Sequence, residues 1–231
     1  MSIRRTSSFD EWEDARRELL EAEKEQTRAR DAVVARRRRM PWLRLEQDHV
    51  LEGPHGPTRL VDVFEGRRQL LLYHFMWTPG QVDACDGCSM FLDHWGHPAH
   101  LWARDVTRAV VSPGPLAEIE PFRERMGWDV PWYSALGTGL YDELRMHGGF
   151  ALNVLVREGD EIHRTYMIDG RGVDYLGSTW SFLDLTPFGR QEEWEDSPPG
   201  TPQGPRYEWW HKHDEYPAEV TSPADAPRST A

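Results

Sequence analysis

Residues 70–95 constrain the fold of this chain more than any other stretch. They hold its only two cysteines, Cys85 and Cys88, in Cys-x-x-Cys spacing. The apolar run before the cysteines, residues 70–77, predicts a buried strand that ends before the chain-breaking Pro79-Gly80 pair. The residues after Cys88 have helical character. A strand, a loop, Cys-x-x-Cys and a helix, in that order, form the context in which this spacing indicates dithiol redox chemistry.

The spacing predicts a different role for each cysteine. Cys85, at the start of the helix, would face unpaired backbone N–H groups and the positive end of the helix dipole, which favour thiolate over thiol. Cys88, one helical turn further on, would be close enough to attack a mixed disulfide on Cys85. We therefore predict that Cys85 attacks and Cys88 resolves. Asp86 opposes this assignment in part, because its negative charge beside Cys85 disfavours the thiolate.

Metal binding is the main alternative, because thiolate and imidazole ligands suit zinc or copper. The ligands would be Cys85 and Cys88 with histidines from the set His74, His94, His97 and His100, foremost His94 and His97. A structural zinc site needs four ligands, however, and the sequence has no second Cys-x-x-Cys. We therefore expect a redox dithiol with no metal and no other cofactor.

Two further alternatives concern the same stretch and the N-terminus. The chain could be a thiol peroxidase in which Cys85 attacks a peroxide; such enzymes polarise the peroxide with Thr or Ser and an Arg, and Thr78 is the only nearby hydroxyl upstream. It could instead be a non-catalytic interaction module that dimerises through an N-terminal helix. Loss or retention of function in cysteine variants separates these possibilities.

The charge balance limits the partners and the compartment. The 231 residues carry a net charge of −12, which disfavours nucleic acid because phosphate contacts need a surplus of Lys and Arg. No apolar run reaches the roughly twenty residues of a membrane span, and the N-terminus lacks the apolar segment of a secretory signal. We therefore expect a cytoplasmic protein whose partner is a thiol or disulfide substrate or a redox protein, with no nucleic acid and no membrane.

Residues 8–39 predict one long helix. Ser8 and Glu11 match a capping box, and a narrow, mostly apolar stripe recurs at every third or fourth residue. The stripe consists of Trp12, Ala15, Leu19, Ala22, Gln26, Ala29 and Val33. So thin a stripe cannot stabilise a lone helix, so we expect this helix to pack on the core or to pair with a second copy in a homodimer.

The rest of the chain predicts an α/β domain followed by a tail. The elements expected after the cysteines are strand 106–112, helix 116–126, strands 150–157 and 161–166, and a helical segment at 173–183. The first of these complete a βαβα unit, whose ligand site would lie at the carboxyl end of its first strand. We divide the chain into an N-terminal helical extension (1–40), an α/β domain (41–190) and an acidic, Pro- and Gly-rich tail that lies extended on the core (191–231).

Three residues are expected to bind substrate beside the dithiol. Trp77 and Pro79 end the strand that leads to the cysteines, and Trp132 belongs to a later aromatic segment. Large amphipathic rings line clefts and fill cores equally well, so filling of the core is the alternative role for the two tryptophans.

Beyond these local patterns, the chain resembles a bacterial thioredoxin-like family known as domain of unknown function 899. The matching segments are residues 20–25, 40–42, 73–76, 85–89, 126–128, 131–134, 169–172, 183–187, 189–192, 209–210 and 213–216. They include Cys-Asp-Gly-Cys-Ser at 85–89 and His-Asp-Glu-Tyr at 213–216, and the resemblance covers about residues 8–216. It implies a thioredoxin-like mixed sheet flanked by helices, with the dithiol on the first helix, and a dithiol-disulfide oxidoreductase activity.

The chain departs from this pattern at two points. The family usually has Gly-Leu-Ser before the penultimate strand, and here Gly149-Phe150-Ala151-Leu152 stands in its place. Thioredoxins carry a cis-proline that faces the dithiol just before that strand, and no proline occurs between Pro131 and Pro187. Because that proline shapes the groove that binds peptides, its absence argues against a general protein-disulfide reductase.

Overall fold

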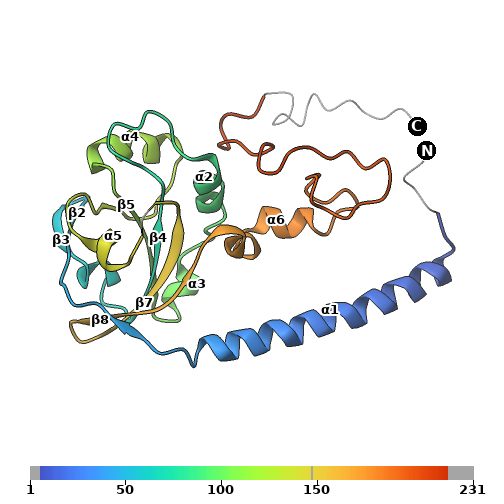
Figure 1. Ribbon diagram of the computed structural model, residues 1–231, viewed down its shortest axis with the longest axis horizontal. Coiled ribbons are helices and arrows are strands. Elements are labelled where there is room, and N and C mark those ends of the chain that lie inside the picture. The colour runs from blue at the N-terminus through green and yellow to red at the C-terminus, as the bar shows by residue number, and fades with distance from the viewer. Residues whose placement is uncertain (1–5, 147, 218–231) are drawn as a thin grey trace.

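The computed structural model describes residues 6–146 and 148–217, in which a mixed sheet of eight strands forms the centre of the molecule (Figure 1). The strands are β1 (Leu43–Arg44), β2 (Val50–Gly53), β3 (Gly56–Arg59), β4 (Gln69–His74), β5 (Val106–Ser112), β6 (Trp132–Ser134), β7 (Ala151–Glu158) and β8 (Glu161–Ile168). The helices are α1 (Phe9–Arg37), α2 (Asp86–Asp93), α3 (Ala99–Trp102), α4 (Leu116–Arg125), α5 (Leu140–Glu143) and α6 (Ser178–Leu183), with the 3-10 helices η1 (Asp62–Phe64) and η2 (Gly170–Leu176).

The order and direction of the strands define the fold. The order across the sheet is β1-β8-β7-β4-β5-β6-β2-β3. Strand β4 runs parallel to β5 and antiparallel to β7, which forms a hairpin with β8. The chain thus forms β4-α2-β5, then α4, then the β7–β8 hairpin, then α6, which is the order of elements in the thioredoxin fold. The expected thioredoxin-like sheet with flanking helices and a long N-terminal helix is therefore confirmed.

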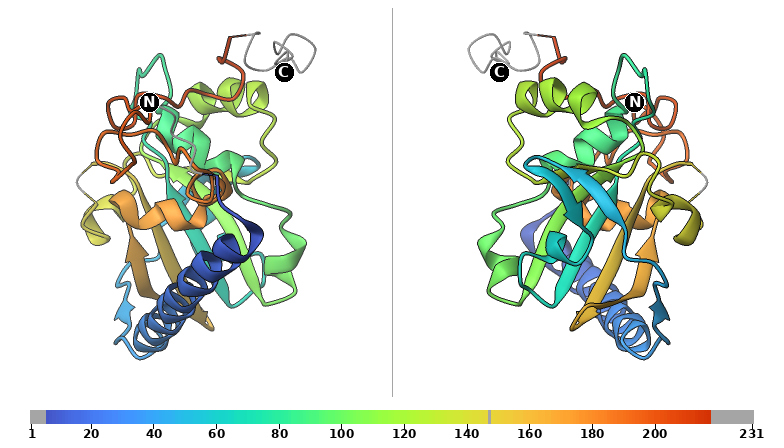
Figure 2. Two further views of the ribbon diagram at one scale, coloured as in Figure 1. Left: turned by 90° about the vertical axis from the view of Figure 1, so that its right-hand side faces the viewer. Right: turned by 90° about the vertical axis from the view of Figure 1, so that its left-hand side faces the viewer.

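Strand β4 is buried on both faces because its side chains alternate between two apolar clusters. Leu70 and Leu72 belong to one cluster, which also contains residues of η1 and α5. Tyr73 belongs to the other, together with residues of α2, α4 and α6. Helices therefore cover the central strands on both sides, as the two side views in Figure 2 show. The second cluster places α2, and with it the cysteines, against the carboxyl end of β4.

The segment between β4 and β5 holds two helices rather than one. Helix α2 ends at Asp93 and a separate short α3 follows, because Gly96 and Pro98 interrupt the helical hydrogen bonds. The short strands near the N-terminal end of the sheet lie at opposite edges: β1 pairs with β8 at one edge, and β2 pairs with β3 and β6 at the other.

Helix α1 has the predicted cap. The Ser8 N–H donates to the Glu11 carboxylate at 2.9 Å, and the Glu11 N–H donates to the Ser8 hydroxyl at 3.2 Å, which closes the capping box. We expected α1 either to pack on the core or to pair with a second copy, and the first arrangement is not the one seen, since α1 buries none of its residues. Among its contacts with the body, the Arg37 guanidinium lies 4.1 Å from the centre of the Tyr166 ring and donates a hydrogen bond to the Tyr166 hydroxyl at 3.2 Å.

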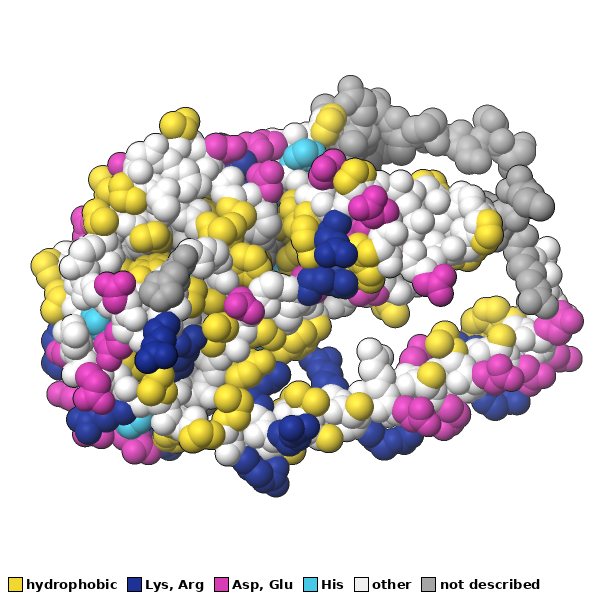
Figure 3. All heavy atoms as spheres, viewed as in Figure 1, with side chains coloured by type: hydrophobic (Ala, Val, Ile, Leu, Met, Phe, Trp, Pro, Cys, Tyr) yellow, Lys and Arg dark blue, Asp and Glu magenta, His cyan; other side chains and the backbone are white. Residues whose placement is uncertain are grey.

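The apolar stripe of α1 is consequently open to solvent. Trp12, Leu19 and Val33 expose 56%, 55% and 51% of their surface. Figure 3 shows apolar side chains along the length of this helix. A helix of this length with an uncovered stripe gains little stability from the rest of its own chain. No helix in the described parts of the chain is both long and apolar enough to span a membrane.

His74, at the end of β4, gives the stability of the fold a pH dependence. Its side chain is fully buried, and neither ring nitrogen has a hydrogen-bond partner among the described residues. Burial lowers the pKa of His74 from 6.5 to about 3, with a smaller contribution from the Arg164 charge. As the pH falls below 6.5, the unfolded chain binds a proton at His74 that the folded chain does not bind, so unfolding becomes more favourable.

We therefore predict that the free energy of unfolding falls between pH 6.5 and pH 3 more steeply in the wild type than in His74→Phe. The difference in slope should approach about 1.4 kcal/mol per pH unit, the value for one proton. Denaturant unfolding at a series of pH values measures it, and the comparison of the two proteins cancels the contribution of the carboxylates. Parallel curves for the two proteins would contradict a neutral, buried His74.

Candidate functional site

The two cysteines lie at the start of α2, where β4 and the loop after it deliver them. Cys85 is the N-cap residue, with extended backbone angles, and its Sγ accepts the Cys88 backbone N–H at 3.4 Å. Cys85 is half-buried, whereas Cys88 exposes 1% of its surface. The strand, loop, Cys-x-x-Cys and helix thus follow in the predicted order, and only the first sulfur is within reach of a reagent from solvent.

The surroundings of the two thiols separate their acidities. The pKa of Cys85 is lowered to about 7, first by the hydrogen bond with the Cys88 thiol and also by the backbone N–H groups of Cys88 and Gly87. Burial and the Asp86 charge oppose this shift. The pKa of Cys88 is raised well above its usual value, mainly by burial. Near neutral pH a large share of Cys85 is therefore thiolate, beside a Cys88 that stays protonated.

Tyr73 on β4 contributes a polar group beneath the dithiol that sequence analysis did not identify. Its hydroxyl lowers the pKa of the Cys88 thiol, against the larger opposite effect of burial, and burial raises the pKa of Tyr73 itself well above the usual value. The ring packs against Phe91 of α2, with the ring centres 4.5 Å apart. The one sequence signal for this residue is a hydroxyl-bearing ring inside an otherwise apolar run.

A cavity of about 240 Å³ opens beside the two sulfur atoms. Its walls come from β4, α2, η2, α6, the residue before β7 and the C-terminal tail. The lining residues are Tyr73, Cys85, Gly87, Cys88, Phe91, Phe150, Gly170, Val173, Asp174, Trp180, Tyr207 and Trp210. Most of these side chains are apolar or aromatic, and Asp174 is paired with Arg190 at 2.7 Å. The dithiol therefore faces an apolar space with one neutralised charge.

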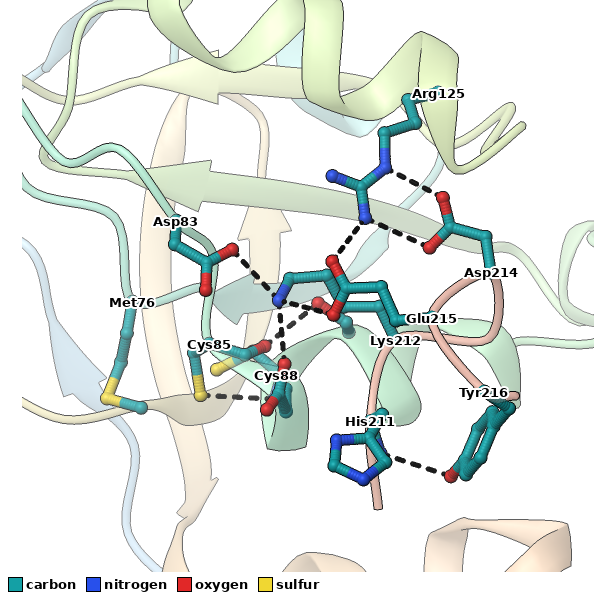
Figure 4. A network of polar contacts seen from close by, with 12 residues as sticks. Met76, Asp83, Cys85, Cys88, Arg125, His211, Lys212, Asp214, Glu215 and Tyr216 are labelled. Atoms are coloured by element: carbon teal, nitrogen blue, oxygen red, sulfur yellow. Dashed lines mark hydrogen bonds and ion pairs between the residues drawn. The ribbon is translucent and has the colours of Figure 1, made fainter.

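The tail is fastened to the cysteine loop by a buried ammonium group (Figure 4). The side chain of Lys212 exposes only 1% of its surface, and its Nζ lies 2.8 Å from Asp86, 2.9 Å from Asp83 and 3.2 Å from Glu215. Burial alone would lower the pKa of Lys212, but the hydrogen bonds to the three carboxylates outweigh it and raise the pKa. Since Asp86 lies between the two cysteines, Lys212 also offsets the charge that opposes a Cys85 thiolate.

A second buried charge shapes the part of the tail that walls the cavity. Glu192 exposes 1% of its surface and accepts hydrogen bonds from the Trp209 indole at 2.8 Å and the Tyr207 backbone at 3.0 Å. Trp210 lies next to these residues and packs edge-on against Trp180, with ring centres 5.6 Å apart.

The sequence gives one weak signal for Lys212, which is that the chain has only two lysines.

The structure does not bring the three predicted substrate-binding residues to the cavity. Trp77 and Trp132 expose 4% and 1% of their surfaces and lie in the apolar cluster between the sheet and α4. Pro79 lies in the exposed loop before the cysteines. None of the three is among the lining residues. Phe150 lines the cavity directly before β7, where thioredoxins carry their cis-proline, and the described residues contain no cis peptide bond.

The histidines of the alternative metal site lie apart from the cysteines. His94 is hydrogen-bonded to the Thr179 hydroxyl at 2.7 Å. His97 accepts the Ala99 N–H at 3.2 Å, and its ring faces His100. Among residues 6–146 and 148–217, no three His, Cys, Asp or Glu side chains converge in a way that could hold a metal ion. The geometry therefore gives the dithiol no third ligand from the described chain.

Comparisons with solved structures find weak likenesses over part of the chain. One is an uncharacterized thioredoxin-like protein from Porphyromonas gingivalis, at 14% identity and a TM-score of 0.42, covering 55% of this chain and 80% of that one. Another is Peroxidoxin BcpB from Mycobacterium tuberculosis, at 18% identity and a TM-score of 0.43, covering 59% and 92%. With such low values, the fold assignment rests on the order and direction of the strands.

None of the curated proteins compared with this sequence matches it significantly. The model of one protein family does match, over residues 1–216, and it describes bacterial proteins of unknown function. The match includes the cysteine segment, the strands and helices of the sheet, and the tail that walls the cavity. The chain therefore belongs to the bacterial family DUF899.

Proposed function

We propose that this protein is a thiol–disulfide oxidoreductase that cycles Cys85 and Cys88 between dithiol and disulfide. The observation that carries the proposal is the asymmetry of the pair. Cys85 has a pKa of about 7 and caps α2 at the mouth of a cavity, whereas Cys88 is buried with a raised pKa. This asymmetry supplies one thiolate for attack and one thiol held back for resolution.

The proposed reaction has two exchange steps. The Cys85 thiolate attacks one sulfur of a substrate disulfide, so that a Cys85–substrate disulfide forms and the other half of the substrate leaves as a thiolate. Cys88 then loses its proton and attacks the Cys85 sulfur, which releases the second half of the substrate as a thiolate. The substrate gains two electrons and, with the Cys88 proton and one from solvent, leaves as two thiols. The protein ends with a Cys85–Cys88 disulfide, which an external dithiol must reduce before the next cycle.

Tyr73 supports the second step. Cys88 is protonated at neutral pH and buried, so its thiolate needs a hydrogen-bond donor to form. The Tyr73 hydroxyl is in hydrogen-bonding contact with this sulfur and remains protonated at neutral pH, because its own pKa is raised. It can therefore donate to Cys88 as the negative charge develops on the sulfur.

The geometry favours a disulfide over a peroxide as the substrate. In the thiol peroxidase alternative, Thr78 would polarise the peroxide, but the Thr78 hydroxyl is hydrogen-bonded to Gln81 in an exposed loop. No arginine is among the residues that line the described cavity. A sulfur leaving group departs as a thiolate without such polarisation, so the site as built suits disulfide exchange.

We further propose that α1 pairs with α1 of a second copy in an antiparallel homodimer. The exposed stripe of Trp12, Leu19 and Val33 supplies an apolar seam. Residues 9–25 carry eight acidic and three basic side chains, a net charge of −5, whereas residues 26–39 carry one acidic and six basic side chains, a net charge of +5. Antiparallel pairing of two copies places each acidic half against a basic half, as a two-fold interface requires.

The exchange function predicts distinct results for the two cysteine variants. Cys85→Ser should reduce the turnover of a small disulfide to the uncatalysed rate, because the attacking sulfur is absent. Cys88→Ser should accept one half of the substrate and stop, because the resolving sulfur is absent. Intact-protein mass spectrometry should then show one added thiol group on Cys85. Full turnover in Cys85→Ser would exclude the proposal.

The lowered pKa of Cys85 predicts how its alkylation depends on pH. Iodoacetamide reacts with the thiolate, so the rate at Cys85 should fall as the pH drops through about 7, rather than through the value of about 8.5 typical of a free cysteine. Peptide mass spectrometry distinguishes Cys85 from buried Cys88. Lys212→Met should move the midpoint upward, because Asp86 is then no longer offset. A wild-type midpoint near 8.5 would contradict the hydrogen-bonded thiolate.

The α1 pairing predicts a dimer that breaks when charge enters the stripe. Leu19→Glu should raise the dimer dissociation constant by at least about tenfold, because it removes an apolar side chain from each half of the seam. Lys24→Glu introduces the same side chain on the opposite face of the helix, outside the seam, and should not raise the dissociation constant, because the added negative charge faces the basic half of the partner helix. Sedimentation velocity over a concentration series measures both. A wild-type monomer at all concentrations would end this proposal.

A further inference from the structure

We infer that the cavity walled by Tyr207 and Trp210 is a substrate subsite for one ring-sized apolar group, so that the protein reacts with small apolar disulfides rather than with polypeptides. This inference rests on the proposed exchange chemistry and names the class of its substrate. It assigns the C-terminal tail, which lies far from the cysteines in sequence, as the element that selects the substrate.

The size of the cavity limits what can enter. Its volume is about 240 Å³, and an apolar cavity of about 150 Å³ is enough to bind benzene. A phenyl ring with a short linker to sulfur therefore fits, whereas a folded polypeptide segment does not. The thioredoxin fold ordinarily leaves the space before the penultimate strand to a cis-proline; here the larger Phe150 lies at that place and helps to close the site.

The chemistry of the walls selects an uncharged occupant. Phe150, Val173, Trp180 and Trp210 present apolar surface, and the carboxylate of Asp174 is already paired with Arg190. The indole N–H of Trp180 is buried and has no hydrogen-bond acceptor among the described residues.

The tail residues that line the cavity, Tyr207 and Trp210, belong to a segment that several contacts hold against the body. Trp210 lies directly against the first turn of α2, since a Cβ added at Gly87 would be 3.7 Å from its ring. Two residues further on, Lys212 binds Asp86, the first residue of α2, at 2.8 Å. Arg125 of α4 binds Asp214 at 2.7 Å and Glu215 at 2.7 Å, which fastens the next residues (Figure 4). The wall and the attacking sulfur therefore have a fixed relative position.

The test uses two mixed disulfides with the same leaving group: benzyl 2-pyridyl disulfide and 2-hydroxyethyl 2-pyridyl disulfide. The reduced full-length protein attacks the alkyl sulfur of either compound and releases 2-thiopyridone, whose absorbance reports the rate of the first step. Only the group that enters the cavity differs between the two. We expect the benzyl compound to react about tenfold faster or more, after each rate is divided by that of free 2-mercaptoethanol with the same compound.

Three variants assign the preference to the tail. Trp210→Ala should lower the benzyl preference by about tenfold, because one wall of the cavity is lost. Lys212→Met should do the same although every lining side chain remains, because the tail is no longer fastened to Asp86. Trp102→Ala removes a tryptophan that is 43% exposed on α3 and should leave the preference unchanged. The iodoacetamide rate at Cys85, measured in parallel, corrects each variant for a change in thiolate content.

The possible results test the substrate subsite and the oxidoreductase function separately. Equal normalised rates with the two compounds, or a preference that survives both tail variants, overturn the subsite and leave the oxidoreductase proposal intact. Faster reduction of insulin disulfides than of the benzyl compound also overturns it. No release of thiopyridone from either compound, while iodoacetamide still labels Cys85, overturns the oxidoreductase proposal itself.

Discussion

The site depends on the buried ammonium group of Lys212. Its three carboxylate partners come from the loop before the cysteines, from between the cysteines and from the tail, so one side chain joins segments that lie 126 residues apart. Loss of one partner from a fully buried ion pair costs about 3–5 kcal/mol; the cost is smaller here because all three carboxylates reach solvent. Lys212 itself does not reach solvent. Its removal would leave the carboxylates of Asp83, Asp86 and Glu215 repelling one another at the start of α2. The tail, the cavity and the acidity of Cys85 all depend on this contact.

Two opposing sets of interactions determine the pKa of Cys85. Burial and the Asp86 charge disfavour the thiolate, while the Cys88 thiol and the backbone N–H groups of α2 favour it. The hydrogen bonds outweigh burial and charge, so the pKa is lowered. The helix start would favour the thiolate more strongly without Asp86, but Lys212 would then hold the tail to this segment through Asp83 alone. The carboxylate between the cysteines therefore has a structural use that offsets its electrostatic cost to the thiolate. The sequence alone shows the cost, since Asp86 is adjacent to Cys85, and not the use, since Lys212 is distant.

The sequence predicted what depends on neighbouring residues and missed what depends on distant ones. The apolar run of β4, the β-branched run of β5 and the turn between β7 and β8 gave the central sheet, and the capping residues gave the start of α1. Cys85 and Cys88 were found by their spacing. Trp77 and Trp132 were placed at the site because their rings suit a cleft, but rings suit a core equally well, and burial in the cluster against α4 decided between the two. Tyr207, Trp210 and Lys212 approach the dithiol only through the path of the tail, for which no local pattern exists.

Closure of the site and loss of the cis-proline have a common consequence. A dithiol that reduces many proteins needs an open groove beside it. An extended substrate chain lies in this groove against the segment that leads into the last hairpin of the sheet, which is the β7–β8 hairpin here. In this chain Phe150 takes up that space from one side, and Tyr207 and Trp210 take it up from the other. Each change alone would only narrow a groove, but together they convert it into a cavity, and the buried charges of Lys212 and Glu192 keep it in that shape. Under the proposed exchange function, the first helix of the fold supplies the chemistry and the tail determines which disulfides can reach it.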